Sequence, residues 1–114
     1  MEGADNMDVK FRIATENDIE AIVELCNECF FENTDPQKAL QIFKDTNDDN
    51  NIYIVGEVDG KIIAHSKITI IPTIYERMGT YSILNNVCVK PEYRRHNIAT
   101  KMLAISVLHV KNSL

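Results

Sequence analysis

The stretch that decides the fold lies at residues 86–103 and reads NVCVKPEYRRHNIATKML. It opens on a valine-rich strand pattern that ends before Pro91, and it closes with apolar residues at helical spacing. A short basic loop with Arg94 and Arg95 lies between them. The first N–H groups of a helix have no partner within the helix and carry partial positive charge. The stretch therefore predicts a strand, an anion-binding loop and a helix, an arrangement that suits a phosphate or pyrophosphate.

The chain before this stretch predicts one strand and two helices. Alternating apolar residues predict a strand at residues 9–14. A capping signature at residues 15–18, followed by apolar residues at helical spacing, predicts a first helix that reaches Phe30. The Asp35-Pro36 pair then begins a second, shorter helix that ends near Lys44.

Three strands and a final helix complete the predicted order. Residues 52–58 and 61–71 are two strands joined by an Asp59-Gly60 turn of type I′, and residues 80–89 form the next strand. The last helix runs from about residue 95 to residue 110, and its nearly continuous apolar character predicts that it is largely buried against the sheet. The order β-α-α-β-β-β-α predicts an α/β (α+β) fold with a mixed, mostly antiparallel sheet flanked by helices.

The composition is that of one globular domain, since the chain has 114 residues, of which 45% are hydrophobic and 25% charged. The polar residues 1–8 are predicted to be a disordered tail, and residues 9–114 the domain. No apolar run approaches the roughly 20 residues that cross a bilayer, and no signal-peptide pattern is present, so we expect a cytoplasmic protein without a membrane partner.

Charge is distributed unevenly along the chain. The net charge is −5, which argues against nucleic acid as a partner. Residues 1–50 carry a net charge of −9 and residues 51–114 a net charge of +4. Much of the positive charge lies between Lys90 and Lys101, which predicts a local anion site in an otherwise acidic protein.

The three cysteines indicate free thiols, because an odd number cannot pair within one chain and no secretory signal is present. Cys26 and Cys29 form a C-x-x-C pattern, but they fall well inside the first predicted helix, whereas a redox motif has its first cysteine at a helix N-terminus. No second cysteine pair completes a tetrahedral metal site. We therefore expect ordinary buried or half-buried helix positions and no metal.

Residues 94–99, RRHNIA, resemble motif A of the GNAT superfamily of N-acetyltransferases, whose pattern is R/Q-x-x-G-x-G/A after a strand ending in V-x-V-x-P-x-Y-R. The first glycine of that pattern is Asn97 here, and asparagine is the non-glycine residue that best tolerates a positive φ. The order of the predicted elements also resembles the N-terminal two-thirds of that fold. The resemblance identifies residues 9–114 as a GNAT-like acyl-CoA N-acyltransferase domain.

The resemblance implies acetyl-CoA as co-substrate. The backbone of residues 87–89 would hydrogen-bond the pantetheine arm like an added strand, and residues 94–100 would hold the pyrophosphate through N–H groups, basic side chains and the Thr100 hydroxyl. The cofactor-binding residues implied are Val87, Cys88, Val89, Arg94, Arg95, His96, Asn97, Ile98, Ala99 and Thr100.

The implied reaction is direct attack of a primary amine of a small molecule or peptide on the acetyl thioester. It needs an oxyanion donor, for which a backbone N–H near Val87 is suited, and a base for the amine proton. Many relatives have a glutamate near this strand, where the present chain has Asn85 and Asn86, and an amide cannot act as a base. His65, Glu76, a carboxylate of the first helix and water relays all stay open. The acidic half of the chain would favour a cationic amine.

The chain also departs from the family after its last helix, because relatives continue with further strands and a helix that often carries a catalytic tyrosine. Residues 104–114 hold no tyrosine, so the general acid cannot be assigned. The resemblance therefore implies a truncated member, a member completed by another chain, or a homodimer that exchanges elements. The alternative function is a non-catalytic CoA-binding or interaction module.

Overall fold

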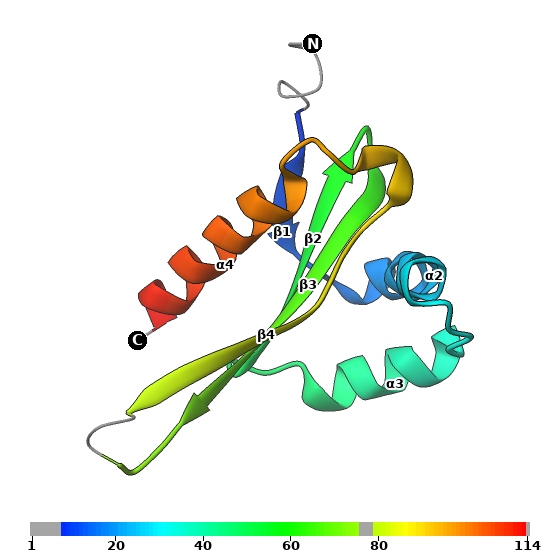
Figure 1. Cartoon of the computed structure of the whole chain (residues 1–114). Coiled ribbons are helices and arrows are strands. Elements are labelled where there is room, and N and C mark those ends of the chain that lie inside the picture. The colour runs from blue at the N-terminus through cyan, green and yellow to red at the C-terminus, as the bar shows by residue number, and fades with distance from the viewer. Residues whose placement is uncertain (1–7, 76–78, 114) are drawn as a thin grey trace.

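A computed structural model of the chain describes residues 8–75 and 79–113, the last five by backbone alone. Figure 1 shows a central sheet with helices on both faces. The elements in chain order are β1 (Lys10–Ile13), the 3₁₀ turn η1 (Glu16–Asp18), α2 (Ile19–Phe30), α3 (Pro36–Thr46), β2 (Asn51–Val58), β3 (Lys61–Pro72), β4 (Thr80–Val89), the 3₁₀ turn η2 (Pro91–Tyr93) and α4 (Ile98–Ser113). The predicted α/β class and the order of strands and main helices are confirmed. The predicted tail, Asp8 apart, lies outside the described residues.

The sheet has the strand order β1-β2-β3-β4, and every pair of neighbours is antiparallel. The turn between β2 and β3 is of the predicted kind, because Asp59 and Gly60 both have positive φ, at 52° and 79°. Both residues therefore match the right-handed twist of the strands that they join. In this order β4 is an edge strand, and within the described chain only β3 pairs with it.

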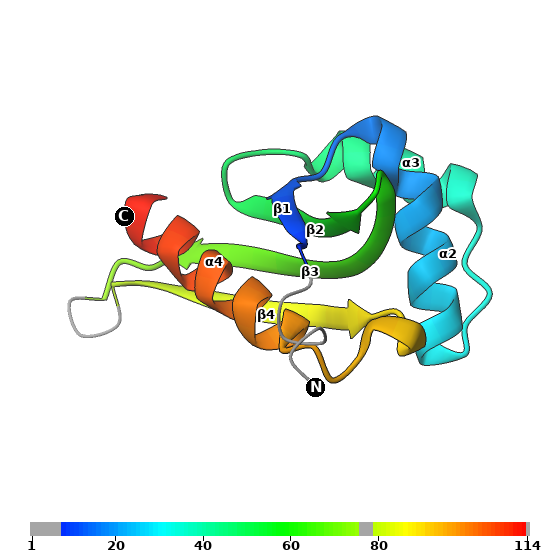
Figure 2. The same cartoon turned by 90° about the horizontal axis from the view of Figure 1, so that it is seen from above.

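The helices form two layers, with α4 on one face of the sheet and α2 with α3 on the other (Figures 1 and 2). Each face has its own apolar core. The core beneath α4 contains Ile52, Ile54, Ile63, Ala64, Ile68, Ile70, Val89, Ile98 and Met102. The core beneath α2 and α3 contains Ala14, Ile19, Ile22, Val23, Phe43 and Val55.

The last helix differs from its prediction in two respects. It begins at Ile98 rather than near residue 95, because Arg95 and Asn97 have φ values of 71° and 58°, which a right-handed helix cannot include. The expectation that it is largely buried was wrong. A helix on a sheet buries one stripe, here Ile98, Met102 and Ser106, whereas apolar residues on its other sides, including Leu108, stay exposed.

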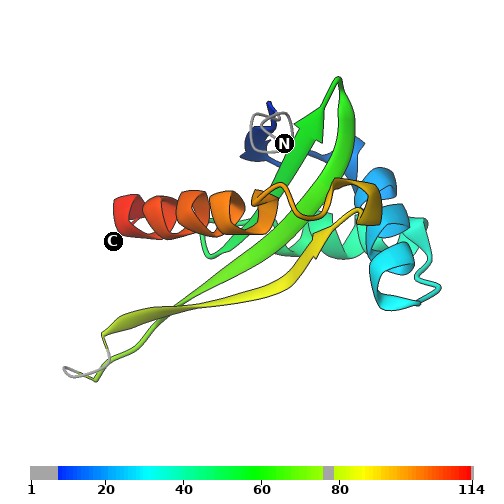
Figure 3. The same cartoon turned by 45° about the horizontal axis from the view of Figure 1, so that its top comes forward.

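The strands β3 and β4 continue beyond β2 as a two-stranded arm, which Figure 3 shows extending past the rest of the sheet. The last pair between β2 and β3 joins Asn51 to Thr69, whereas β3 and β4 still pair at Pro72 and Thr80. The length of this ladder holds β4 in place, although β3 is its only strand neighbour among the described residues.

A charged cluster fixes the start of α2 against β1. Arg12 Nη1 and Nη2 donate to the two carboxylate oxygens of Asp18 at 2.7 and 2.9 Å, and Arg12 Nε donates to Glu57 at 2.6 Å. Asp18 also accepts a hydrogen bond of 2.8 Å from the Thr15 N–H, as the predicted capping signature requires. The Arg12 guanidinium lowers the pKa of Asp18 to about 2. The Asp18 carboxylate is therefore ionised at neutral pH, and Arg12 joins it to Glu57 of β2.

We predict that Asp18→Asn lowers the free energy of unfolding at pH 7 by about 1–2 kcal/mol, because the folded protein loses an ion pair that the unfolded chain lacks. A carboxylate with a lowered folded pKa stabilises the fold above its unfolded pKa, and this contribution disappears as the pH falls through about 2. Urea unfolding at pH 7, 4 and 2 measures it, with exposed Asp49→Asn as the control. If the free energies of unfolding of Asp18→Asn and the natural protein differ as much at pH 2 as at pH 7, the stabilisation does not come from the ion pair.

Candidate functional site

A β-bulge interrupts β4 inside the stretch that opened the sequence analysis. His65 pairs with Cys88 and Lys67 pairs with Asn85, so that two residues of β4, Asn86 and Val87, lie opposite one residue of β3. Asn86 has a φ of 54°, in the left-handed region. At a bulge the extra residue stays outside the strand ladder, so backbone groups at this point are available to a ligand.

The residue of β3 opposite the bulge is Ser66, which is almost completely buried. Its hydroxyl has no hydrogen-bond partner among the described residues. Buried hydroxyls normally have one. The bulge in β4 therefore lies opposite a buried hydroxyl that has no partner in the described part of the chain.

The end of β4 is exposed on one side and buried on the other. Val87 is 40% exposed, whereas Cys88 and Val89 are buried. Within the described chain the edge of β4 that faces away from β3 has no strand partner. Such an edge accepts an extended ligand through its N–H and C=O groups, as the sequence analysis expected for residues 87–89.

A hollow of about 210 Å³ lies where β4 passes into α4. Its lining residues are Val89, Tyr93, Arg94, Arg95, Asn97, Ile98, Ala99 and Thr100. Seven of the ten predicted cofactor residues are thus in one place, while Val87, Cys88 and His96 do not line it. Tyr93 was missed, although its place directly before Arg94 in the motif pattern was a signal for it.

The backbone of the loop explains the hollow. Asn97 has the positive φ that the sequence analysis anticipated, and Arg95 has one as well. The Asn97 carbonyl accepts a hydrogen bond of 3.0 Å from the Lys101 N–H, which begins the helical pattern. The N–H groups of the first turn have no partners within the helix, and left-handed residues beside a helix start turn such groups to one concave side. This geometry suits a phosphate group.

The positive charge at the hollow comes from Arg94 and Arg95. Arg94 is anchored to the strand, since its Nε donates to the Val89 carbonyl at 3.0 Å. Lys90, which contributed to the predicted anion site, is directed elsewhere, because its Nζ lies 3.0 Å from a carboxylate oxygen of Glu28. The basic surface at the hollow is therefore smaller than the run of basic residues in the sequence suggested.

A second cavity, of about 250 Å³, opens on the other face of the sheet between α2, α3 and the bulge. Its lining is mainly apolar and consists of Ile19, Ile22, Val23, Cys26, Thr34, Lys38, Ala39, Ile42, Phe43, Tyr53, His65 and Asn86. No carboxylate is among these described lining residues. Asn86 belongs to both this cavity and the bulge, so the two features are adjacent.

His65 is the buried titratable group of this cavity. Its Nδ1 lies 3.0 Å from the Ile54 carbonyl oxygen, and a carbonyl only accepts, so Nδ1 carries the proton and Nε2 has a lone pair. Burial lowers the pKa of His65 to about 4, although the bond to Ile54 opposes the shift. The ring stacks against Tyr53 with centroids 6.2 Å apart. His65 is therefore a neutral imidazole at pH 7.

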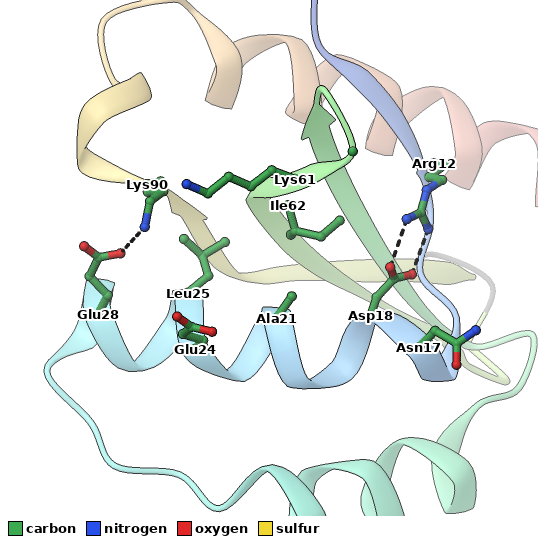
Figure 4. Close-up of a pocket in the computed structure, with 11 residues that line it drawn as sticks. Arg12, Asn17, Asp18, Ala21, Glu24, Leu25, Glu28, Lys61, Ile62 and Lys90 are labelled. Carbon is green, nitrogen blue, oxygen red and sulfur yellow. Dashed lines mark hydrogen bonds and ion pairs between the residues drawn. The ribbon is translucent and has the colours of Figure 1, made fainter.

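The other bases considered from the sequence do not lie in this cavity. Glu76 lies outside the described residues. Glu24 and Glu28 of α2 line a separate cleft of about 390 Å³, in which Glu28 pairs with Lys90 and Asp18 pairs with Arg12 (Figure 4). None of the ten predicted cofactor residues lines this cleft. These two ion pairs join α2 to the end of β4 and the start of α2 to β1.

Two further properties concern the described residues as a whole. No helix in residues 8–75 and 79–113 is long and apolar enough to cross a membrane. In the same residues no three histidine, cysteine or acidic side chains are arranged to hold a metal ion.

We predict that His65 makes stability fall between pH 6.5 and pH 4. A folded pKa below the unfolded one means that the stabilisation is complete above pH 6.5 and is lost as the pH falls through about 4. The expected loss is about 2–3 kcal/mol. Urea unfolding at pH 7, 5.5 and 4.5 measures it, and His65→Gln should flatten the dependence. An equally steep dependence in His65→Gln would show that another group is responsible.

Comparison with solved structures reveals a common fold. A transcriptional regulator from Bacillus halodurans C-125 aligns with a TM-score of 0.84 and 21% identity, over 92% of this chain and 75% of that chain. Glucosamine-6-phosphate N-acetyltransferase from Arabidopsis thaliana aligns with a TM-score of 0.79 and 19% identity, over 92% of this chain and 76% of that chain. A predicted acetyltransferase from Clostridium acetobutylicum, solved with acetyl-CoA, aligns with a TM-score of 0.75 and 23% identity, over 92% and 75% of the two chains.

No curated protein matches the sequence. A family profile does match it, over residues 10–113, and this profile is described as an acetyltransferase (GNAT) domain. The match runs from the start of β1 to the end of α4 and thus includes the bulge, the basic loop and the helix start described above. The chain belongs to the GNAT family of acetyltransferases.

Proposed function

We propose that the chain transfers an acetyl group from acetyl-CoA to a primary amine at the open edge of β4. The observation that carries this proposal is the continuity of one strand. The bulge at Asn86 and Val87 offers unpaired backbone groups, and the same strand leads into the basic hollow at the start of α4. A thioester at the bulge and a pyrophosphate at the hollow are the two ends of one extended ligand.

The residues proposed for the cofactor are the ten inferred from the sequence, together with Tyr93. The open edge at residues 87–89 offers N–H and C=O groups to the amides of the pantetheine arm. Arg94, Arg95 and the first N–H groups of α4 suit the pyrophosphate. The predicted acetyltransferase from Clostridium acetobutylicum, which shares the fold, was solved with acetyl-CoA.

The amine acceptor is proposed to enter through the apolar cavity between α2 and α3. This cavity reaches Asn86, so an amine inside it approaches the bulge from the face opposite α4. Its described lining has one lysine and no carboxylate. The acceptor is therefore proposed to be a small-molecule or peptide amine that carries an apolar group, rather than the strongly cationic amine that the acidic half of the sequence suggested.

The proposed reaction is direct attack. The neutral amine nitrogen bonds to the thioester carbonyl carbon, and backbone N–H groups at the bulge stabilise the resulting oxyanion. The C–S bond then breaks, CoA leaves as a thiolate and the amine proton passes to a base. Water is the proposed base, because burial lowers the pKa of His65 and makes its imidazole a weak proton acceptor. His65 lines the same cavity, and its Nε2 lone pair is proposed to accept a hydrogen bond from the amine. The thiolate takes its proton from water.

We predict that Asn97→Pro lowers the affinity for acetyl-CoA at least about 10-fold in isothermal titration calorimetry, whereas Asn97→Gly preserves it. Proline fixes φ near −65°, far from the observed 58°, while glycine adopts a positive φ without strain. Both variants remove the Asn97 side chain, but only proline prevents the positive φ, so the comparison isolates the effect of the backbone conformation on affinity. Equal affinities of the two variants would contradict the assignment of the hollow.

An activity assay on the same purified chain distinguishes the proposed enzyme from a module that only binds CoA. A screen of apolar and cationic primary amines, with detection of free CoA thiol, should give turnover that is greater for the apolar amines. If the chain binds acetyl-CoA but releases no CoA in the presence of any of the amines, the non-catalytic alternative is supported. Absence of binding by the folded chain would overturn both.

We predict that Asn86→Val lowers kcat by about 100-fold, the cost of losing one oxyanion donor. A β-branched residue disfavours the left-handed conformation by roughly 1–2 kcal/mol, so the bulge and its N–H groups shift. Asn86→Gly keeps the backbone geometry and should retain most of the activity. If both variants lose activity equally, the Asn86 side chain rather than the bulge is required.

A further inference from the structure

The three cysteines gather where α2 meets the end of β4. Cys26 Sγ lies 3.6 Å from Cys88 Sγ, although the residues are 62 positions apart. Cys29 Sγ instead donates to the Val89 carbonyl at 3.5 Å and lies 3.8 Å from Arg94 Nη2. The C-x-x-C spacing therefore does not identify the partner of Cys26. The tertiary structure pairs it with Cys88.

The two paired thiols differ in environment. Cys88 is only 5% exposed, whereas Cys26 is half-buried and lines the apolar cavity between α2 and α3. The contact between the two thiols, in which either can donate, and burial raise the pKa of Cys88. Cys26 lines the cavity and Cys88 does not, so the cavity gives a small oxidant access to the Cys26 sulfur.

We propose that Cys26 and Cys88 form an oxidisable dithiol that takes a hydroperoxide as its oxidant. In the first step the Cys26 sulfur attacks the peroxide O–O bond and becomes a sulfenic acid, while the peroxide is reduced and, for hydrogen peroxide, leaves as water. In the second step the Cys88 sulfur attacks the Cys26 sulfur, the S–O bond breaks and a second water leaves. Two electrons pass from the dithiol to the peroxide, and a disulfide remains.

The geometry favours this bond over the alternatives. A disulfide has an S–S distance of about 2.05 Å, so the sulfurs must approach each other by about 1.5 Å from their contact at 3.6 Å. Cys29 is held by the end of the strand and by Arg94. The bond would tie α2 to β4 directly after the bulge and narrow the apolar cavity. A consequent loss of acetyl transfer rests on the proposed function, whereas the bond itself does not.

The test uses the whole chain with all three thiols reduced. It is treated with hydrogen peroxide, the remaining thiols are alkylated, and the intact mass and a peptide map are recorded. We expect a mass lower by two hydrogens before alkylation, one alkylated cysteine instead of three after it, and a peptide that links Cys26 to Cys88. The link should form at least about 10-fold faster in the folded chain than in urea, because the fold holds the sulfurs together.

Cys29→Ser is the matched control and should form the same link at the same rate. Cys26→Ser and Cys88→Ser should each form no link between these positions. Cys26 is half-buried, so we expect Cys26→Ser to fold, and circular dichroism checks this. A link that contains Cys29, with either Cys26 or Cys88, would overturn the proposal. So would three alkylated thiols in the folded, peroxide-treated chain, or equal rates of formation in the folded chain and in urea.

Discussion

The pairing of β4 with β3 is the interaction on which the rest of this structure depends. β4 has no other strand neighbour in the described chain, so this one ladder fixes its place in the sheet. The ladder also contains the bulge at Asn86, which turns the following residues so that Cys88 faces α2 while Val89 enters the core beneath α4. The bulge in this ladder thus determines where the backbone groups of β4 are open, where Cys88 meets Cys26 and where the basic loop begins.

The two faces of the sheet have separate roles. On one face α4 buries a single stripe against the sheet and presents its first turn to the basic hollow. On the other face α2 and α3 enclose the apolar cavity with neutral His65 at its inner wall. The bulge in β4 lies between these faces, which is the geometry needed when one substrate is held along a strand and a second approaches from the opposite layer.

Some basic side chains of the molecule form ion pairs with carboxylates, whereas others line the hollow. Arg12 is bound by Asp18 and Glu57, and Lys90 is bound by Glu28, so these side chains stabilise contacts between elements instead of meeting a ligand. Arg94 and Arg95 remain at the hollow beside the helix start. The excess of acidic residues in the first half of the chain consequently says little about the apolar cavity, whose described lining has no carboxylate.

By itself the sequence determined the order of strands and helices, the Asp59-Gly60 turn and the basic loop before α4, because each depends on residues that are neighbours along the chain. The left-handed conformation at Asn97 was predictable for the same reason, since asparagine tolerates it locally. Only the tertiary structure decided the bulge at Asn86, the pairing of Cys26 with Cys88 and the burial that keeps His65 neutral. The tertiary structure also pairs Lys90 with Glu28, so that Lys90 does not line the basic hollow. These features depend on contacts between distant segments, and neither spacing nor composition encodes which side chains such contacts bring together.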